Sequence, residues 1–110
     1  MDIWKRGIGF VEQIYKDTNK FPKEELYGLT SQIRRSSVSY PSNIAEGAAR
    51  ASKKEFIQFM YISLGSLSEV ETQLIIAEKL NFLNANRLLE EVDALRRMTL
   101  NFIKYLKSKK

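Results

Sequence analysis

The sequence predicts an all-α fold, an antiparallel up-down-up-down four-helix bundle that forms a single domain over residues 1–110. Apolar residues recur at spacings of three and four in each of four segments, which is typical of helices with one buried face. Short polar stretches separate the segments, and no stretch shows the alternating pattern of a half-buried strand. We expect helices near residues 2–18, 22–49, 53–81 and 85–107.

The first two helices are predicted from an apolar stripe and a proline. The first stripe consists of Trp4, Gly7, Ile8, Val11, Ile14 and Tyr15, and it ends at the polar run 17–20. Pro22 follows, and proline favours the first turn of a helix because its missing N–H would have no partner there. Glu24 and Glu25 come next, where the helix dipole favours carboxylates. These features predict that the second helix begins at Pro22.

The middle of the second helix combines a proline with many small side chains. Pro41 lacks the N–H that would bond to the carbonyl of Ser37. We therefore expect a bend near residues 37–41, with serine hydroxyls turned toward backbone carbonyls. Small side chains also let neighbouring helices approach closely. The small residues here are Ser36, Ser37, Ser39, Ser42, Ala45, Gly47, Ala48, Ala49 and Ala51.

The third and fourth helices are predicted from their start signals. Residues 52–55 read Ser-Lys-Lys-Glu, the S-x-x-E pattern of a capping box. The stripe that follows consists of Phe56, Met60, Ser63, Leu67, Val70, Leu74 and Ala77. Asn84 and Asn86 predict the start of the last helix, because asparagine caps helix N-termini. Its stripe consists of Leu88, Val92, Leu95, Thr99, Phe102 and Leu106.

Glycines in these helices favour self-association. Glycine in a helix interior costs about 1 kcal/mol relative to alanine. Four glycines lie in the predicted helices or at their ends: Gly7, Gly28, Gly47 and Gly65. We expect that some of them allow a second subunit to approach closely.

The composition argues against an enzyme. The chain has no cysteine and no histidine, which excludes disulfides, Cys/His zinc sites, and thiol or histidine catalysis. It also removes the Glu-x-x-His pairs of ferritin-like di-iron sites. We expect no catalytic site, no metal and no cofactor. Because no apolar run reaches transmembrane length and no signal-peptide core opens the sequence, we expect a soluble cytoplasmic protein.

Basic side chains are the main functional candidates, because the net charge is +5 and most of the excess follows residue 84. The candidate nucleic-acid-binding residues are Arg34, Arg35, Arg50, Lys53, Lys54, Lys107, Lys109 and Lys110. Such side chains neutralise phosphates. Arginine serves carboxylates equally well, so Arg34 or Arg35 alternatively pairs with Glu46 or with a neighbouring subunit. The terminal lysines alternatively complement the dipole of the last helix.

A second group of polar residues favours a structural role. Asn43 and Glu46 lie among apolar and small residues, so we expect buried hydrogen bonds that stabilise the bent helix. With Pro41 and Gly47 they form a structural motif. Tyrosines can stack on bases, yet most are expected at the edge of the core or at subunit interfaces. The five tyrosines are Tyr15, Tyr27, Tyr40, Tyr61 and Tyr105.

Several motifs resemble those of a known family. They are Phe21-Pro22, Leu29-Thr30-x-Gln32-Ile33-Arg34-Arg35, Ser39-x-Pro41-x-Asn43-Ile44-Ala45-Glu46-Gly47, Arg50 and Gly65-Ser66-Leu67-x-Glu69. From about Trp4 to Leu106 the chain resembles the four-helix bundle proteins of the 23S rRNA intervening-sequence family. That family includes the accessory variability protein of diversity-generating retroelements, which works alongside a reverse transcriptase. The resemblance implies a ring-like homopentamer and a role in nucleic-acid binding.

Two functional classes remain open. The first is a nucleic-acid-binding accessory protein that engages RNA or DNA phosphates with little sequence preference. The second is a protein–protein scaffold whose basic surface meets an acidic partner, such as a reverse transcriptase or another protein encoded by a neighbouring gene. Strong salt dependence of binding to generic nucleic acid would favour the first class.

Overall fold

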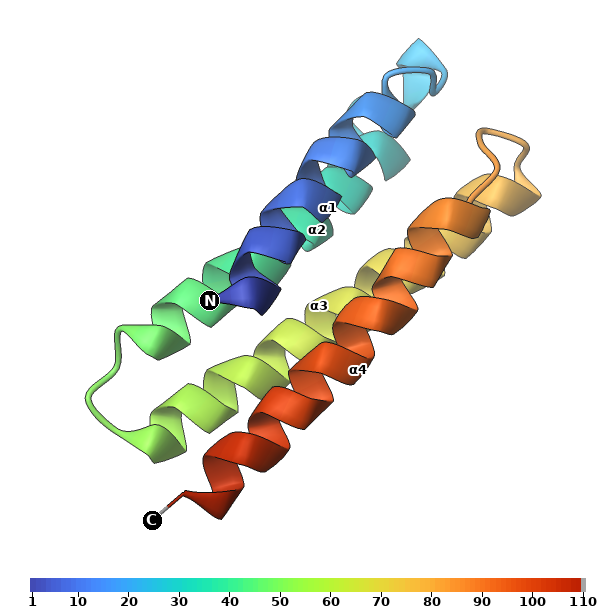
Figure 1. Cartoon of the computed structure of the whole chain (residues 1–110). Helices are drawn as coiled ribbons and strands as arrows, with labels where there is room; N and C mark the ends of the chain where they lie inside the picture. The colour runs from blue at the N-terminus through green and yellow to red at the C-terminus, as the bar shows by residue number, and fades with distance from the viewer. Residues whose placement is uncertain (110) are drawn as a thin grey trace.

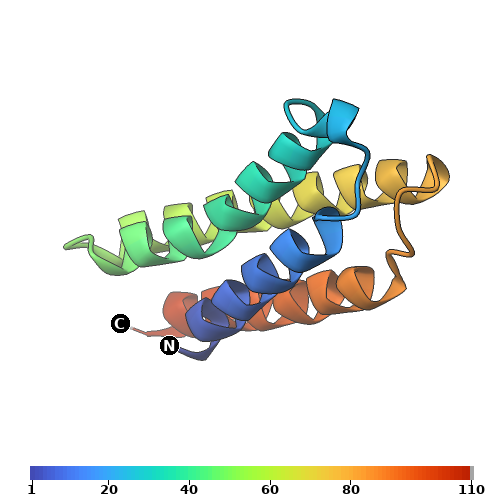
Figure 2. The same cartoon turned by 90° about the horizontal axis from the view of Figure 1, so that it is seen from above.

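Four long helices make up most of residues 1–109, the part of the chain that the computed structural model describes. They are α1 (Asp2–Thr18), α2 (Leu29–Ala48), α3 (Lys53–Lys79) and α4 (Asn86–Ser108), and a 3-10 turn, η1 (Lys23–Glu25), precedes α2. Consecutive helices run in opposite directions (Figure 1). Helices α1 and α3 each pack against both α2 and α4 (Figure 2). The predicted all-α four-helix bundle is confirmed.

The core runs along the axis of a bundle that measures 49 × 23 × 19 Å. Every helix contributes fully buried apolar side chains, which include Ile14, Ile33, Ile44, Leu67, Leu74, Val92 and Leu95. Those of α1, α3 and α4 come from the stripes that the sequence predicts, because a spacing of three and four keeps them on one helix face. Within residues 1–109, none of the helices combines the length and the apolarity needed to cross a membrane.

The start of the second helix differs from the prediction. Residues 23–25 form only the 3-10 turn, and α2 begins at Leu29 rather than at Pro22. Phe21 is buried against Phe82 of the α3–α4 connection, with ring centroids 5.4 Å apart. That contact holds the chain in a separate turn ahead of the helix. Glu25 then accepts a hydrogen bond from the backbone N–H of Leu29 at 3.2 Å, so its carboxylate caps α2 from outside.

The other helix ends lie within two residues of their predicted positions. Ser52 Oγ accepts a hydrogen bond from the N–H of Glu55 at 3.1 Å, as a capping box requires. Helix α3 ends in a Schellman motif around Asn81, whose φ of 63° lies in the left-handed region. In that motif the N–H of Phe82 bonds to the carbonyl of Ala77 at 2.9 Å. Asparagine tolerates this conformation better than other side chains, which explains why the chain turns here.

Small residues bring α2 and α3 together, and these two helices form the most extensive contact in the bundle. Serine hydroxyls link them directly. Ser66 Oγ lies 2.9 Å from Ser39 Oγ, and Ser63 Oγ donates to the carbonyl of Tyr40 at 3.1 Å. Pro41 lies inside the continuous helix α2, next to these contacts. Ser37 Oγ turns toward a backbone carbonyl, that of Arg34, at 2.8 Å. The bend at Pro41 stays a prediction.

The glycines divide between packing within the chain and open surface. A Cβ on Gly7 would lie 2.8 Å from the Tyr40 ring, and one on Gly47 would lie 2.7 Å from Phe59 Cβ. Both positions therefore serve contacts inside the bundle. Gly65 has open space around it, so it remains available for contact with another subunit.

Candidate nucleic-acid interface

Five of the predicted basic residues meet at one end of the bundle, which we call the basic end. Arg50 follows α2, Lys53 and Lys54 lie in the first turn of α3, and Lys107 and Lys109 lie at the end of α4. The α2–α3 connection and the C-terminal end of α4 lie together in Figure 1. Lys53 Nζ donates to the backbone carbonyl of Lys109, which joins the two segments directly. All five side chains are exposed.

Aromatic rings hold several of these cations in place. The ammonium group of Lys107 lies 5.2 Å from the centre of the Tyr61 ring and donates to the Tyr61 hydroxyl at 2.8 Å. Lys109 lies 5.1 Å from the centre of the Tyr105 ring. Cation–π contacts of this kind keep the charge at the surface while restricting the side chain. The basic end therefore presents charges whose positions are partly set before any ligand arrives.

Positive charge dominates the two segments that form the basic end. Residues 46–55 and 104–109 carry six cationic side chains and two carboxylates. One carboxylate, Glu46, pairs with Arg50 at 2.7 Å, four residues away on the same stretch. Lys104, which is not among the candidates predicted from the sequence, is exposed one turn before Lys107 on α4. The spacing of three residues between the two lysines is the signal that places them on one helix face.

Arg34 and Arg35, although predicted as candidates together with the residues of the basic end, lie elsewhere on the bundle. At a rise of 1.5 Å per residue they lie about 22–24 Å from Arg50 along the axis of α2. The guanidinium of Arg34 donates to Thr18 Oγ1 at 3.0 Å and to Asn19 Oδ1 at 3.1 Å, so it ties α2 to the end of α1. Arg35 is exposed beside it. Lys110, the remaining candidate, lies outside the described residues.

The residues of the structural motif around Pro41 also differ in burial. Asn43 is half-buried and donates to the carbonyl of Ser39 at 2.8 Å, a bond that follows the helix backbone. Glu46, in contrast, is exposed rather than buried. It pairs with Arg50 and not with Arg34 or Arg35, because α2 places its side chain one turn before the corner. The prediction that Glu46 makes a buried hydrogen bond is therefore wrong.

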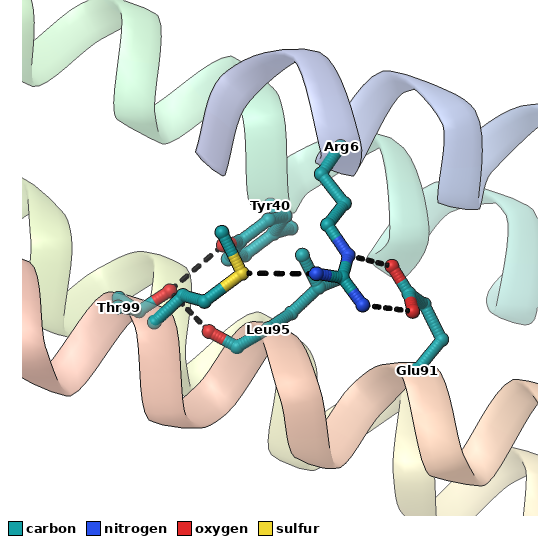
Figure 3. A network of polar contacts seen from close by, with 6 residues as sticks. Arg6, Tyr40, Glu91, Leu95 and Thr99 are labelled. Carbon is teal, nitrogen blue, oxygen red and sulfur yellow. Dashed lines mark hydrogen bonds and ion pairs between the residues drawn. The ribbon is translucent and has the colours of Figure 1, made fainter. Parts of the chain in front are cut away.

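A hollow of about 830 Å³ lies between α1 and α4. Arg6 of α1 donates to both carboxylate oxygens of Glu91 on α4, at 2.7 and 2.9 Å (Figure 3). This hydrogen bonding, together with the charge of Glu91, raises the pKa of Arg6. The charged residues around the hollow balance, with Arg6, Lys20, Arg87 and Arg97 opposite Asp17, Glu90, Glu91 and Asp93. The net charge of the side chains that line the hollow is therefore zero.

The described residues show no cluster of side chains that is typical of a metal site. Across residues 1–109, His, Cys, Asp and Glu side chains nowhere form a group of three or more that could hold a metal ion. The basic end, in contrast, brings cationic side chains together from two distant parts of the sequence.

The sequence model of the family described as 23S rRNA-intervening sequence protein matches residues 1–101 of the 110-residue chain. The chain belongs to this family. The resemblance inferred from the motifs is confirmed. The match to the 23S rRNA-intervening sequence family includes α1, α2, α3 and the larger part of α4. It ends before Lys107 and Lys109, so the α4 side of the basic end lies beyond the matched region.

A solved structure supports the same fold. It belongs to a protein with unknown function from the S23 ribosomal protein family of Bacteroides thetaiotaomicron. The two structures align with a TM-score of 0.84 over 93% of this chain and 95% of that chain, at 20% sequence identity. At this identity the likeness shows the fold alone. No curated protein is similar enough in sequence to match this chain.

Proposed function

We propose that this member of the 23S rRNA-intervening sequence family is a non-enzymatic, oligomeric cytoplasmic protein that binds nucleic acid through its basic end. The observation that carries the proposal is the convergence of Arg50, Lys53, Lys54, Lys107 and Lys109 from two distant segments. Cations grouped in this way neutralise phosphates and release condensed counterions.

A salt titration tests this function. Binding of mixed-sequence duplex DNA and of RNA is measured for the wild type and for a variant with Arg50, Lys53 and Lys54 changed to alanine. Each phosphate that a cation neutralises contributes about 0.9 to the slope of log affinity against log salt for duplex DNA. Because Arg50 already pairs with Glu46, we expect the variant to flatten the slope by about 2–3. Affinity should fall alike for all sequences.

A second triple variant provides the matched control. Changing Lys20, Arg87 and Arg97 to alanine removes the same charge from the α1–α4 hollow, away from the basic end. We expect this variant to keep most of the wild-type slope. Equal losses in both variants would indicate that only net charge matters. Absence of wild-type binding at low salt would instead favour the scaffold function, in which the basic end meets an acidic protein.

Self-association is the second part of the proposal. Helix α3 carries apolar side chains on its outer surface, where Ile62 and Ile76 are 50% and 44% exposed. Both lie on the face that contains Gly65, whose open backbone permits close approach of another copy. The family resemblance favours five copies of the 12.8-kDa chain. A ring would repeat the basic end and combine several weak phosphate contacts.

Sedimentation measures the assembly directly. We expect the wild type to sediment as an oligomer at micromolar concentration and an Ile76→Asp variant to shift toward the monomer, because a carboxylate on this face would be buried without a partner. Leu100→Asp on α4, where the side chain is 47% exposed, serves as the control. A wild type that stays monomeric at micromolar concentration would contradict the proposed assembly.

A further inference from the structure

A second hollow lies at the other end of α2, away from the basic end. It has a volume of about 490 Å³ and is formed where α1 meets the chain before and after the start of α2. Figure 1 shows this end of α2 and the α2–α3 connection at opposite ends of the helix. Its lining residues are Tyr15, Leu26, Tyr27, Ser31, Arg34, Arg35 and Val38. We call it the tyrosine hollow.

The tyrosine hollow presents an aromatic ring to solvent. Tyr27 is 94% exposed, and Leu26 beside it is 47% exposed. Tyr15 is also exposed, and the guanidinium of Arg34 stacks over its ring at 4.6 Å. Hydrogen bonds from Arg34 to Thr18 and Asn19 hold that stack in place. The hollow therefore offers an exposed aromatic ring next to a cation–π pair that hydrogen bonds hold in place.

The charged side chains that line the tyrosine hollow are all positive. Both ionised side chains that line it are arginines, and no carboxylate lines it. Nε and Nη2 of Arg34 donate hydrogen bonds within the chain. Arg35, in contrast, makes no hydrogen bond or ion pair to the residues that the structure describes. A free guanidinium next to an exposed ring fits a ligand that joins a flat aromatic group to an anion.

We infer that the tyrosine hollow binds an unpaired nucleotide of a single-stranded nucleic acid. Tyr27 stacks on the base, Arg35 pairs with the adjacent phosphate, and the Arg34–Tyr15 stack forms the wall. Paired bases in a duplex are not free to stack on a protein ring, whereas single strands bind proteins through such stacking. The inference rests on the proposed nucleic-acid binding and extends it, because it makes a single strand the preferred ligand.

The test compares two strands that differ only in their bases. One is a single-stranded oligothymidylate, and the other is an abasic strand with the same number of phosphates. We expect the wild type to bind the strand with bases about tenfold more tightly, since stacking on one aromatic side chain is commonly of that size. Tyr27→Ala should remove this preference, and Tyr27→Phe should keep it because the ring remains. At 94% exposure, replacing Tyr27 leaves the core intact.

Arginine variants separate the base from the phosphate. Arg35→Ala should weaken binding of both strands by a similar factor, because its contact is with a phosphate. Arg97→Ala removes an equal charge beside the α1–α4 hollow and should have a smaller effect on both strands. The preference for bases should persist when Arg50, Lys53 and Lys54 are changed to alanine, because the tyrosine hollow lies at the other end of α2.

The outcomes distinguish the two proposals. Equal wild-type binding of both strands overturns the tyrosine hollow and leaves phosphate binding by the basic end standing. No binding of either strand at low salt overturns both. If Tyr27→Ala changes the sedimentation of the protein without changing the preference for bases, another copy of this chain covers the hollow, and the inference is overturned.

Discussion

Replacing Tyr40 with alanine is expected to lower the free energy of unfolding by about 3–5 kcal/mol, the usual range for removing a buried aromatic side chain. Tyr40 is completely buried, and its hydroxyl lies 2.7 Å from Thr99 Oγ1 on the diagonally opposite helix α4 (Figure 3). Thr99 donates its own proton to the carbonyl of Leu95 at 2.7 Å. The Tyr40 hydroxyl is therefore the donor, and the side chain links α2 to α4 through the centre of the bundle.

The control for this prediction is Tyr40→Phe, which removes the hydroxyl and keeps the ring. It should cost about 1–2 kcal/mol, because Thr99 loses a donor but retains its bond to Leu95. Urea denaturation followed by circular dichroism measures both variants. A loss below about 1 kcal/mol for Tyr40→Ala would show that the core is not organised around this ring.

Alkaline pH gives a second measurement on the same residue. Burial raises the pKa of Tyr40, and this effect outweighs the contact between the Tyr40 and Thr99 hydroxyls, which lowers it. The folded protein therefore holds the phenol proton more tightly than the unfolded chain does. The resulting stability is fully present below the ordinary tyrosine pKa of about 10 and is lost as the pH rises through the raised value. The Tyr40→Phe variant should lose less stability than the wild type over this range.

Replacing Gly47 with alanine is the second change with a large expected effect. The added Cβ would lie 2.7 Å from Phe59 Cβ and 3.0 Å from Phe56 Cδ1. Because Phe59 Cβ is attached directly to the backbone of α3, the contact is relieved only if α2 and α3 move apart. Overpacking of this kind costs about 1–3 kcal/mol. The helix propensity of alanine returns part of that loss, so we expect a net destabilisation of about 1–2 kcal/mol.

Gly9→Ala is the matched control, since Gly9 lies inside α1 and a Cβ there would meet no atom within 4 Å. The same substitution should stabilise the protein by about 0.5–1 kcal/mol at this position, because only helix propensity changes. Thermal unfolding of the two variants should therefore shift in opposite directions. A stabilising Gly47→Ala would contradict the close approach of α2 and α3 at the corner before the basic end.

The sequence predicts the helices well because their signals are local. Spacings of three and four residues place the stripes on one face, and the capping box at Ser52 acts within one turn. The start of α2 is the exception. Pro22 and Glu24 suit a helix start by local rules, yet the burial of Phe21 against Phe82 separates η1 from the helix. A contact between residues so far apart in the chain leaves no local pattern.

For the candidate functional residues, too, the sequence determines some properties and the tertiary structure determines others. Composition determines that the chain is cationic and that cysteine and histidine chemistry is unavailable. Only the tertiary structure decides which cations are neighbours, because the length of α2 separates Arg35 from Arg50 and the antiparallel return of α4 brings Lys107 to Tyr61. Helix periodicity is thus determined by the sequence through local hydrogen bonding and burial. The grouping of charge at the surface depends on how whole helices pair, which no local pattern specifies.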